Sequence, residues 1–250
     1  MTKSNLGRLL ATARDLRQQR RFAESFNLLH QSLPRDEKLR YQLWKHQPSF
    51  WQSFGGGGLV LRRRTGEDCQ FLRDVCSNID FVRRYAPSGI AIPSDDGALK
   101  AILEAEYVAS IDEVPAIHWI IEDSFRKKLG LASLVDISAT HRRAELLLGF
   151  TKEAHARMTI RALLLIFYRF FESWKMYKLY GYILKDNHKA IDTALNLGFR
   201  CEGTLCEHIA EPKSGARKTL IIVAATKFDV GTSRHLKLAT RLLATQDNQS

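Results

Sequence analysis

Three short runs of strand-forming residues follow one another closely between positions 115 and 150, and they constrain the fold more than any other feature. The runs are "AIHWIIED", "LGLASLVDIS" and "AELLLGF", and only short turns separate them. Strands spaced so closely along a chain are typical of an antiparallel meander. This segment therefore predicts three neighbouring strands of one sheet.

Helices and strands alternate after the meander. We expect a long helix from about Met158 to Trp174, then a strand "LYGYIL", a helix "HKAIDTALNLG" and two strands around "GTLCEHIA" and "KTLIIVAATKF". Before the meander, "LVLRR" predicts a first strand, Thr65 an N-cap, and residues 98–109 a helix. Antiparallel pairing followed by alternation indicates the α+β class with a mixed sheet.

The ends of the chain differ from its middle. Apolar residues recur at helical spacing between Leu6 and Leu33, so residues 1–54 are expected to form a basic helical appendage. Four consecutive glycines, Gly55 to Gly58, predict a linker, because glycine weakens the interior of a helix or strand. The main domain is then residues 59–228, and residues 229–250 are a tail with one basic helix and a frayed end.

Charge and apolar content limit the class of protein. The composition, 45% hydrophobic and 26% charged, excludes a disordered or collagen-like chain. The longest apolar runs are far below the roughly 20 residues of a membrane span, so no membrane partner is expected. The N-terminus lacks the apolar core of a secretory signal, which predicts a cytoplasmic protein.

The net charge of +11 is concentrated near the start of the chain. Residues 1–58 hold ten Lys and Arg against four Asp and Glu. Such a surplus attracts nucleic acid or an acidic protein, although a solvated helix face has the same composition. The four cysteines and the histidines and acids lack metal-ligand spacing, so we expect free thiols and no metal.

Two motifs in the second half of the chain resemble a known family. These are "HRRAEL", at His141–Leu146, and "DNHKAIDTALNLGFRCEG", at Asp186–Gly203. With the opening "LVLRRRTGEDCQFLRDV", they resemble the GNAT superfamily of acyl-CoA-dependent N-acyltransferases over residues 59–228. Within it, the chain is most similar to the branch of the ribosomal-protein-alanine N-acetyltransferases.

The resemblance implies a mostly antiparallel, splayed sheet flanked by helices, with acetyl-CoA in its cleft. Pantetheine would pair with the strand "AELLLGF", and the pyrophosphate would lie at the N-terminus of the helix beginning near Met158. Asn187 matches the family's Asn, which binds pantetheine, but Asn is equally suited to cap the following helix. The expected cofactor-binding residues are Leu147, Leu148, Gly149, Phe150, Arg157, Met158, Thr159 and Asn187.

The pyrophosphate loop departs from the family pattern, which is Gln/Arg-x-x-Gly-x-Gly/Ala. Ala154 stands at the first position, Arg157 at the first Gly and Thr159 at the second small residue. Side chains there would push the phosphates outward, whereas Arg157 would offer a charged fork to a phosphate oxygen. Three hypotheses follow: the loop still binds acetyl-CoA, the domain has become a non-catalytic binding protein, or the donor is a longer acyl group or a carrier-protein arm.

The favoured function is transfer of an acetyl group to a primary amine by direct attack in a ternary complex. The acceptor would be a protein N-terminus or a small molecule. Glu145 matches the motif's acid and is the candidate base, with a salt bridge to Arg142 or Arg143 as the alternative. The family's frequent tyrosine acid is replaced by Ala194. The candidate acceptor-binding residues are His118, Glu122 and His141, and the loop from Pro87 to Gly97 is a candidate lid.

Overall fold

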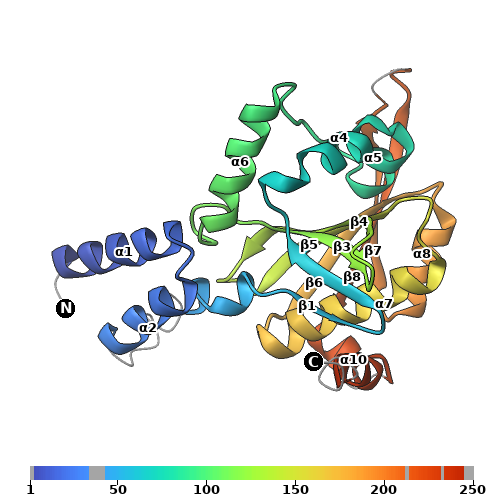
Figure 1. The fold of residues 1–250 in the computed structure, drawn as a ribbon. Helices are drawn as coiled ribbons and strands as arrows, with labels where there is room; N and C mark the ends of the chain where they lie inside the picture. The colour runs from blue at the N-terminus through green and yellow to red at the C-terminus, as the bar shows by residue number, and fades with distance from the viewer. Residues whose placement is uncertain (1–2, 34–42, 212–213, 232–233, 245–250) are drawn as a thin grey trace.

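A computed structural model describes residues 3–33, 43–211, 214–231 and 234–244. Within these residues eight strands form one sheet of order β1-β2-β3-β4-β5-β6-β8-β7 (Figure 1). The predicted α+β fold is confirmed, including the antiparallel meander of β3, β4 and β5. The strands are β1 (Phe54–Gly56), β2 (Leu59–Arg63), β3 (Ile117–Asp123), β4 (Lys128–Ser138), β5 (Arg143–Phe150), β6 (Lys178–Leu184), β7 (Arg200–Ala210) and β8 (Arg217–Thr226).

The sheet parts in its middle, between β5 and β6. These two strands are parallel and pair only where Arg143, Ala144 and Glu145 lie beside Lys178, Leu179 and Tyr180. From Leu146 to Phe150, β5 pairs with β4 on one side, and no pairing with β6 is found in the described part of the chain. One edge of this segment therefore offers its backbone N–H and C=O groups to another partner.

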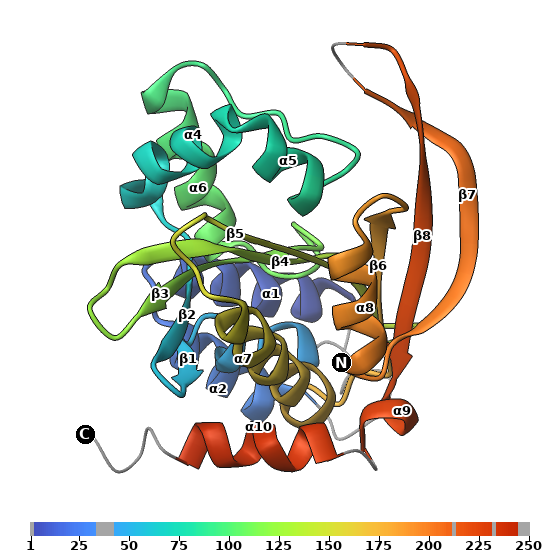
Figure 2. The same ribbon diagram turned by 90° about the vertical axis from the view of Figure 1, so that its right-hand side faces the viewer.

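Helices cover both faces of the sheet (Figure 2). On one face lie α4 (Cys69–Ser77), α5 (Ile79–Tyr85) and α6 (Asp96–Val108), and on the other α7 (Ala156–Phe167) and α10 (Arg234–Ala244). The helix α8 (His188–Asn196) follows β6. Side chains of β5 alternate between the two layers: Leu146, Leu148 and Phe150 join the core with α7, and Leu147 joins the core with α4, α5 and α6.

Helix boundaries follow the local sequence closely. Thr65 forms the expected cap as part of a capping box at the 3₁₀ turn η2 (Gly66–Asp68), which leads into α4. The long helix begins at Ala156, two residues before the expected Met158, and after Phe167 continues as the π-helical segment η3 (Tyr168–Ser173). A short helix, α9 (Lys227–Gly231), precedes the expected basic helix α10. The predicted frayed end, residues 245–250, lies outside the described residues.

The four glycines are a hairpin and not a linker, which corrects the predicted boundary. Gly55 and Gly56 belong to β1 and pair with Val60 and Leu59 of β2. Gly57 and Gly58 form the two-residue turn, with φ of +59° and +83°. Such a turn between antiparallel strands requires positive φ at both positions, which glycine adopts without steric cost. The run of glycines therefore starts the sheet.

Gly56 is also a point of close approach between distant segments. A Cβ atom at this position would stand 2.1 Å from the backbone oxygen of Leu242 in α10. Because only a hydrogen fits there, the C-terminal helix packs directly on the backbone of β1.

The appendage consists of α1 (Lys3–Gln18) and α2 (Phe22–Ser32), which pack on each other around Ala13, Leu29 and Leu33. Buried Arg17 docks it on the domain by donating to Glu113 at 2.9 Å and to the carbonyl oxygen of Val108 at 3.2 Å. Three other arginines of the appendage also form ion pairs, namely Arg14 with Glu113, Arg20 with Glu104, and Arg21 with Glu24. This ion pairing favours docking of the appendage on the domain over the hypothesis of a nucleic-acid or acidic-protein partner.

No helix in the described residues is long and apolar enough to cross a membrane.

Candidate active site

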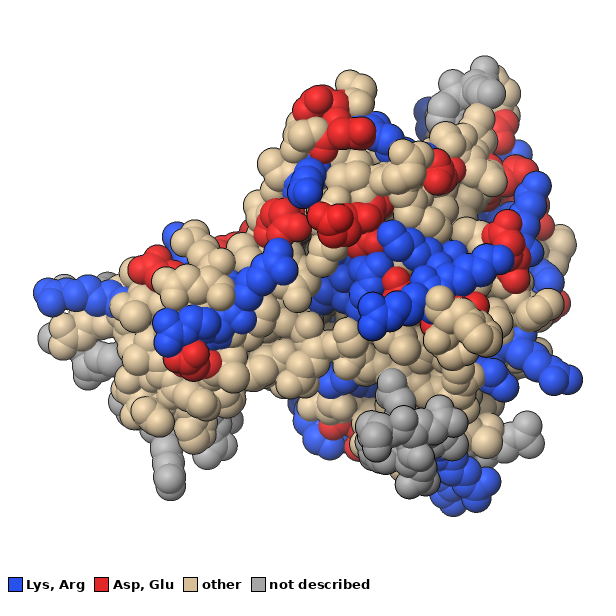
Figure 3. Space-filling view, in the orientation of Figure 1, with Lys and Arg blue, Asp and Glu red and all other residues tan. Residues whose placement is uncertain are grey.

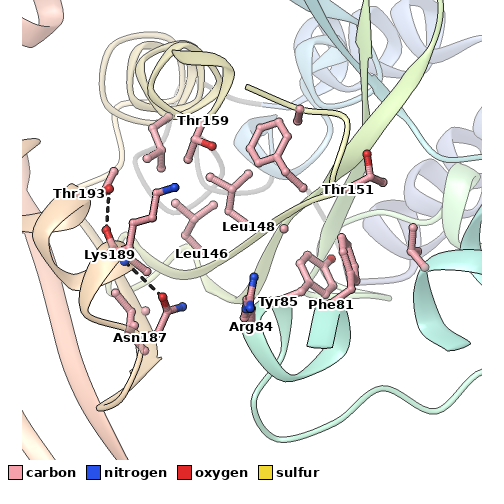
Figure 4. Close-up of a pocket in the computed structure, with 18 of the residues that line it drawn as sticks. Phe81, Arg84, Tyr85, Leu146, Leu148, Thr151, Thr159, Asn187, Lys189 and Thr193 are labelled. Atoms are coloured by element: carbon pink, nitrogen blue, oxygen red, sulfur yellow. Dashed lines mark hydrogen bonds between the residues drawn. The ribbon is translucent and has the colours of Figure 1, made fainter. Parts of the chain in front are cut away.

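A cavity of about 930 Å³ occupies the opening between β5 and β6 (Figure 4). Its walls come from α4 and α5 on one face of the sheet, from α7 on the other, and from the β5–α7 loop, β6 and α8. The cavity thus passes through the sheet from one helical layer to the other. This arrangement allows two ligands to enter from opposite faces and meet between the strands.

The wall from α5 rests on β5 at a glycine. A Cβ atom at Gly149 would lie 2.9 Å from both Phe81 Cζ and Tyr85 Cβ, so the helix sits directly against the strand. The Tyr85 hydroxyl lies 2.5 Å from Ser133 Oγ, which lies 2.6 Å from His118 Nδ1. Burial raises the pKa of Tyr85 to about 12. Burial, together with the charges of Arg64 and Arg63, lowers the pKa of His118 well below 6.5.

The strand β5 supplies the free edge that the resemblance assigned to pantetheine. Leu148, Gly149 and Phe150 line the cavity, as does Leu146, which had not been included among the candidate residues. Leu147 does not line it, because its side chain points into the core with α4, α5 and α6. Any role of Leu147 is therefore confined to its backbone.

The N-terminus of α7 faces the cavity with one side only. Ala156, Thr159, Ile160 and Leu163 line the cavity, as expected for positions i, i+3, i+4 and i+7 of a helix. Arg157 and Met158, both expected to bind the cofactor, lie off this stripe and are absent from the lining, so their side chains do not face the cavity. The N-cap His155 makes no side-chain cap hydrogen bond. The Met158 amide donates to the His155 carbonyl oxygen at 2.8 Å, and the cap leaves the amides of Ala156 and Arg157 to another acceptor.

The opposite wall begins with Asn187. Its side-chain oxygen accepts a hydrogen bond from the amide of Ala190 at 3.4 Å, so it caps α8, and it also lines the cavity. Lys189, in the first turn of the same helix, points into the cavity beside Thr159 (Figure 4). Sequence reasoning missed Lys189, as it missed Lys152 and Arg84, although a lysine directly after the "DNH" cap was visible in the motif.

Glu145 lies at the inner end of the opening, half-buried, and does not line the cavity. Burial and then the negative charge of Asp136 raise its pKa above 4.5. The predicted salt bridge to arginine is wrong. Arg143 donates instead to Asp136 at 2.7 Å and to the Tyr180 hydroxyl at 2.9 Å, and Arg142 donates to the carbonyl oxygen of Lys175. Tyr180 itself lines the cavity and donates to Asp136 at 2.5 Å.

The candidate acceptor residues lie outside the cavity lining, so their assignment is corrected. His118 is half-buried and is linked to Tyr85 through Ser133 Oγ. Glu122 pairs with Arg62 at 2.7 Å in a buried cluster that includes Asp68. His141 is exposed in the β4–β5 turn, where its amide donates to Ser138 Oγ at 3.2 Å. Even spacing placed His118 and Glu122 on one face of β3, but that face is covered by α4, α5 and α6.

The loop between α5 and α6 is also separate from the cavity. None of its residues lines the cavity, and Ile90 and Ile92 pack against the core formed with α4, α5 and α6. The predicted lid over the acceptor is therefore not supported.

In the described residues no group of three or more His, Cys, Asp or Glu side chains is placed to hold a metal ion.

A sheet that parts beside a helix N-terminus, with a cavity running through the gap, defines an acyltransferase-like fold. The chain belongs to the GNAT acetyltransferase family, because the family model "Acetyltransferase (GNAT) domain" matches residues 58–200. The predicted superfamily is confirmed. The ribosomal-protein branch stays a prediction.

Curated relatives match over a shorter stretch. The spermidine N(1)-acetyltransferases of Escherichia coli strains K12 and O157:H7 are each 39% identical over 80 residues, which is 32% of this chain and 43% of theirs. The match thus spans less than half the length of these relatives.

Solved structures share the fold. Spermidine N-acetyltransferase from Vibrio cholerae, in complex with CoA and spermine, has a TM-score of 0.60 and 19% identity over 70% of this chain and 99% of that one. The same enzyme with manganese ions has a TM-score of 0.56 at 19% identity, over 70% of this chain and 98% of that one.

Proposed function

We propose that this protein is an N-acetyltransferase that moves the acetyl group of acetyl-CoA to a small primary amine by direct attack in a ternary complex. The cavity through the parted sheet is the observation that carries this proposal. It offers separate entries from the two faces and one place, beside the free edge of β5, where the two substrates would meet.

The donor side suits a pantetheine arm ending in a diphosphate. Pantetheine amides would pair with the free backbone edge of Leu146–Phe150, in the manner of an added strand. The phosphates would lie at the first turn of α7, where the amides of Ala156 and Arg157 and the helix dipole favour an anion. Lys152 and Lys189, both in the lining, add positive charge there.

The missing glycines are compatible with this mode of binding. Arg157 lies outside the lining, so its side chain does not fill the phosphate position, and Ala156 and Thr159 present only small side chains. This supports the hypothesis that the loop still binds acetyl-CoA over the hypothesis of a domain that has lost it. A longer acyl group or a carrier-protein arm stays the alternative donor.

On the acceptor side, the amine must lose a proton before it attacks the thioester carbonyl. Glu145 shares the face of β5 that carries Gly149 and is turned toward α5, and its raised pKa brings it closer to the pH at which a base works. Since it stands outside the lining, a water molecule would relay the proton. The departing CoA thiolate needs little help, because a thiol pKa of roughly 8.5 makes it a tolerable leaving group.

The acceptor is proposed to be a small molecule. The relatives that match in sequence are named for acetylation of spermidine, and the solved neighbour holds spermine with CoA. The cavity walls of α4 and α5 come close to β5, which suits a slender amine between them.

Calorimetry and a transfer assay test the proposal. We expect the full chain to bind acetyl-CoA with a micromolar dissociation constant and to release CoA only when a primary amine is present. Mass spectrometry should show the amine gaining one acetyl group. Absence of acetyl-CoA binding at millimolar ligand would overturn the proposal in favour of a non-catalytic protein.

A further inference from the structure

One cation in the cavity stands apart from those near α7 and α8. Arg84 belongs to α5, on the acceptor side; its side chain is exposed and lines the cavity, and in Figure 4 it lies below Leu146 and Leu148. Lys189 approaches from the other helical layer, beside Thr159. Within the described residues the structure records no ion pair or hydrogen bond of the Arg84 guanidinium, so it is available to a ligand.

Three contacts fix the helix that carries Arg84. Asn78 caps α5 by accepting from the amide of Phe81 at 3.1 Å, and Phe81 and Tyr85 press against Gly149. The adjacent Arg83 pairs with Asp186, across the cavity, and lies 4.0 Å from a carboxylate oxygen of Glu211. Together these contacts fix the position of α5 and hence of Arg84, which lines the cavity.

A carboxylate lies one helical turn before this guanidinium. Asp80 also lines the cavity, and residues four apart on a helix have Cβ atoms roughly 5–6 Å apart. No ion pair between Asp80 and Arg84 is found in the described residues. One helix therefore presents a negative and a positive group to the cavity.

The overall charge of the cavity also favours a ligand that carries a carboxylate. Its lining contains five cations against three carboxylates, which are Asp74, Asp80 and Glu153. Figure 3 shows that Lys and Arg side chains also gather on the surface below the α4, α5 and α6 helices. A purely cationic amine would meet repulsion at Arg84, whereas a carboxylate would gain a charge-assisted, bidentate contact.

We propose that the amine accepted by this protein carries a carboxylate, which Arg84 binds, so that the acceptor is a small amino acid and not a polyamine. This inference rests on the proposed function and narrows its substrate class. It makes Arg84 the residue that selects the acceptor and leaves the phosphates of acetyl-CoA to Lys152 and Lys189.

Two pairs of amines that differ only by a carboxylate measure how much that group contributes to recognition of the acceptor. Lysine is cadaverine with one added carboxylate, and ornithine is putrescine with the same addition. We expect kcat/KM of the full chain to be at least roughly tenfold higher for lysine than for cadaverine, and likewise for ornithine over putrescine. Dissociation constants measured by calorimetry in the presence of CoA should show the same order.

Arg84→Gln should bring both ratios close to one, and Arg84→Glu should reverse them. Arg126→Gln is the matched control, since Arg126 is exposed in the β3–β4 turn and outside the lining, and it should leave the ratios unchanged. The inference is overturned if the unmodified protein prefers cadaverine. It is also overturned if Arg84→Gln weakens acetyl-CoA binding and leaves the amine ratio as it was.

The calorimetric arm separates this inference from the proposed function. If no amine is acetylated but lysine binds in an Arg84-dependent way, the transfer proposal fails and the binding inference stands. If cadaverine is acetylated faster than lysine, the transfer proposal stands and the inference about Arg84 fails.

Discussion

Gly149 and Phe81 lie in direct contact, and a Cβ atom on the glycine would come within 2.9 Å of the phenylalanine ring. This contact joins the free-edged strand β5 to α5, the helix proposed to form the acceptor wall. The depth of the cavity on that side depends on how closely the helix approaches the strand.

We predict that Gly149→Ala destabilises the protein by about 1–3 kcal/mol, since α5 would have to move outward. Urea unfolding monitored by tryptophan fluorescence measures the loss. Gly7→Ala is the control: it places a methyl group in open space within α1, so stability should rise by up to about 1 kcal/mol. Equal stability of the two variants would show that α5 does not rest on β5.

Glu145→Gln should lower kcat by about a hundredfold or more if Glu145 takes the amine proton. In the unmodified protein, kcat/KM should begin to fall with acid at a pH above the usual pKa range of a glutamate, because burial and Asp136 raise the pKa of Glu145. Asp136→Asn removes a negative neighbour and should move this limb to lower pH. A limb that stays in place would exclude Glu145 as the titrating base.

Lys189→Ala should weaken acetyl-CoA binding by about tenfold and make the dissociation constant less sensitive to salt, because one phosphate contact is lost. Lys185→Ala, in the exposed turn between β6 and α8, provides the control and should change the dissociation constant less than twofold. Calorimetry at two salt concentrations checks both expectations. If both variants lost a similar amount of acetyl-CoA affinity, the overall positive charge of the region would account for the effect, and not a specific contact of Lys189.

Asp68 offers a test of stability against pH. Burial alone would raise its pKa, but hydrogen bonds from Arg62, Lys128 and the Thr65 amide hold it at about 2, below the ordinary 3.8. Its stabilising contribution is therefore present at neutral pH and is lost as the pH falls from about 4 to 2. Asp68→Asn should cost about 3 kcal/mol at pH 7, and this difference should shrink over that pH interval.

The control for this experiment is Glu67→Gln. Glu67 is exposed and pairs with Lys100 at 3.2 Å on the surface. Its effect on the free energy of unfolding should stay within about 0.5 kcal/mol at every pH. A pH-independent cost at Asp68 would mean that shape, and not charge, accounts for its role.

Local signals predicted most of the fold. Closely spaced runs of strand-forming residues located β3, β4 and β5, and Thr65 marked the start of its helical segment. The glycine run was misjudged because composition alone does not show that Gly57 and Gly58 form a turn whose strands pair with each other. Pairing between segments is a tertiary property, and the approach of Leu242 to Gly56 is visible only in space.

The site was predicted less completely, for a geometric reason. Of the residues expected to bind the cofactor, Leu148, Thr159 and Asn187 line the cavity, whereas Arg157 does not, because it lies on another side of α7. His118 and Glu122 share one face of β3, as their even spacing indicated. That face is covered by helices from an earlier part of the chain, so it does not line the cavity. Arg84 and Lys189 enter the cavity through helix orientation, which no spacing rule in one sequence specifies.

The bare backbone at Gly56 couples opposite ends of the polypeptide. The last described helix packs on the backbone of the first hairpin. Shortening the protein before Leu242, or attaching a bulky group to α10, would uncover that backbone and favour self-association at a place distant from the cavity.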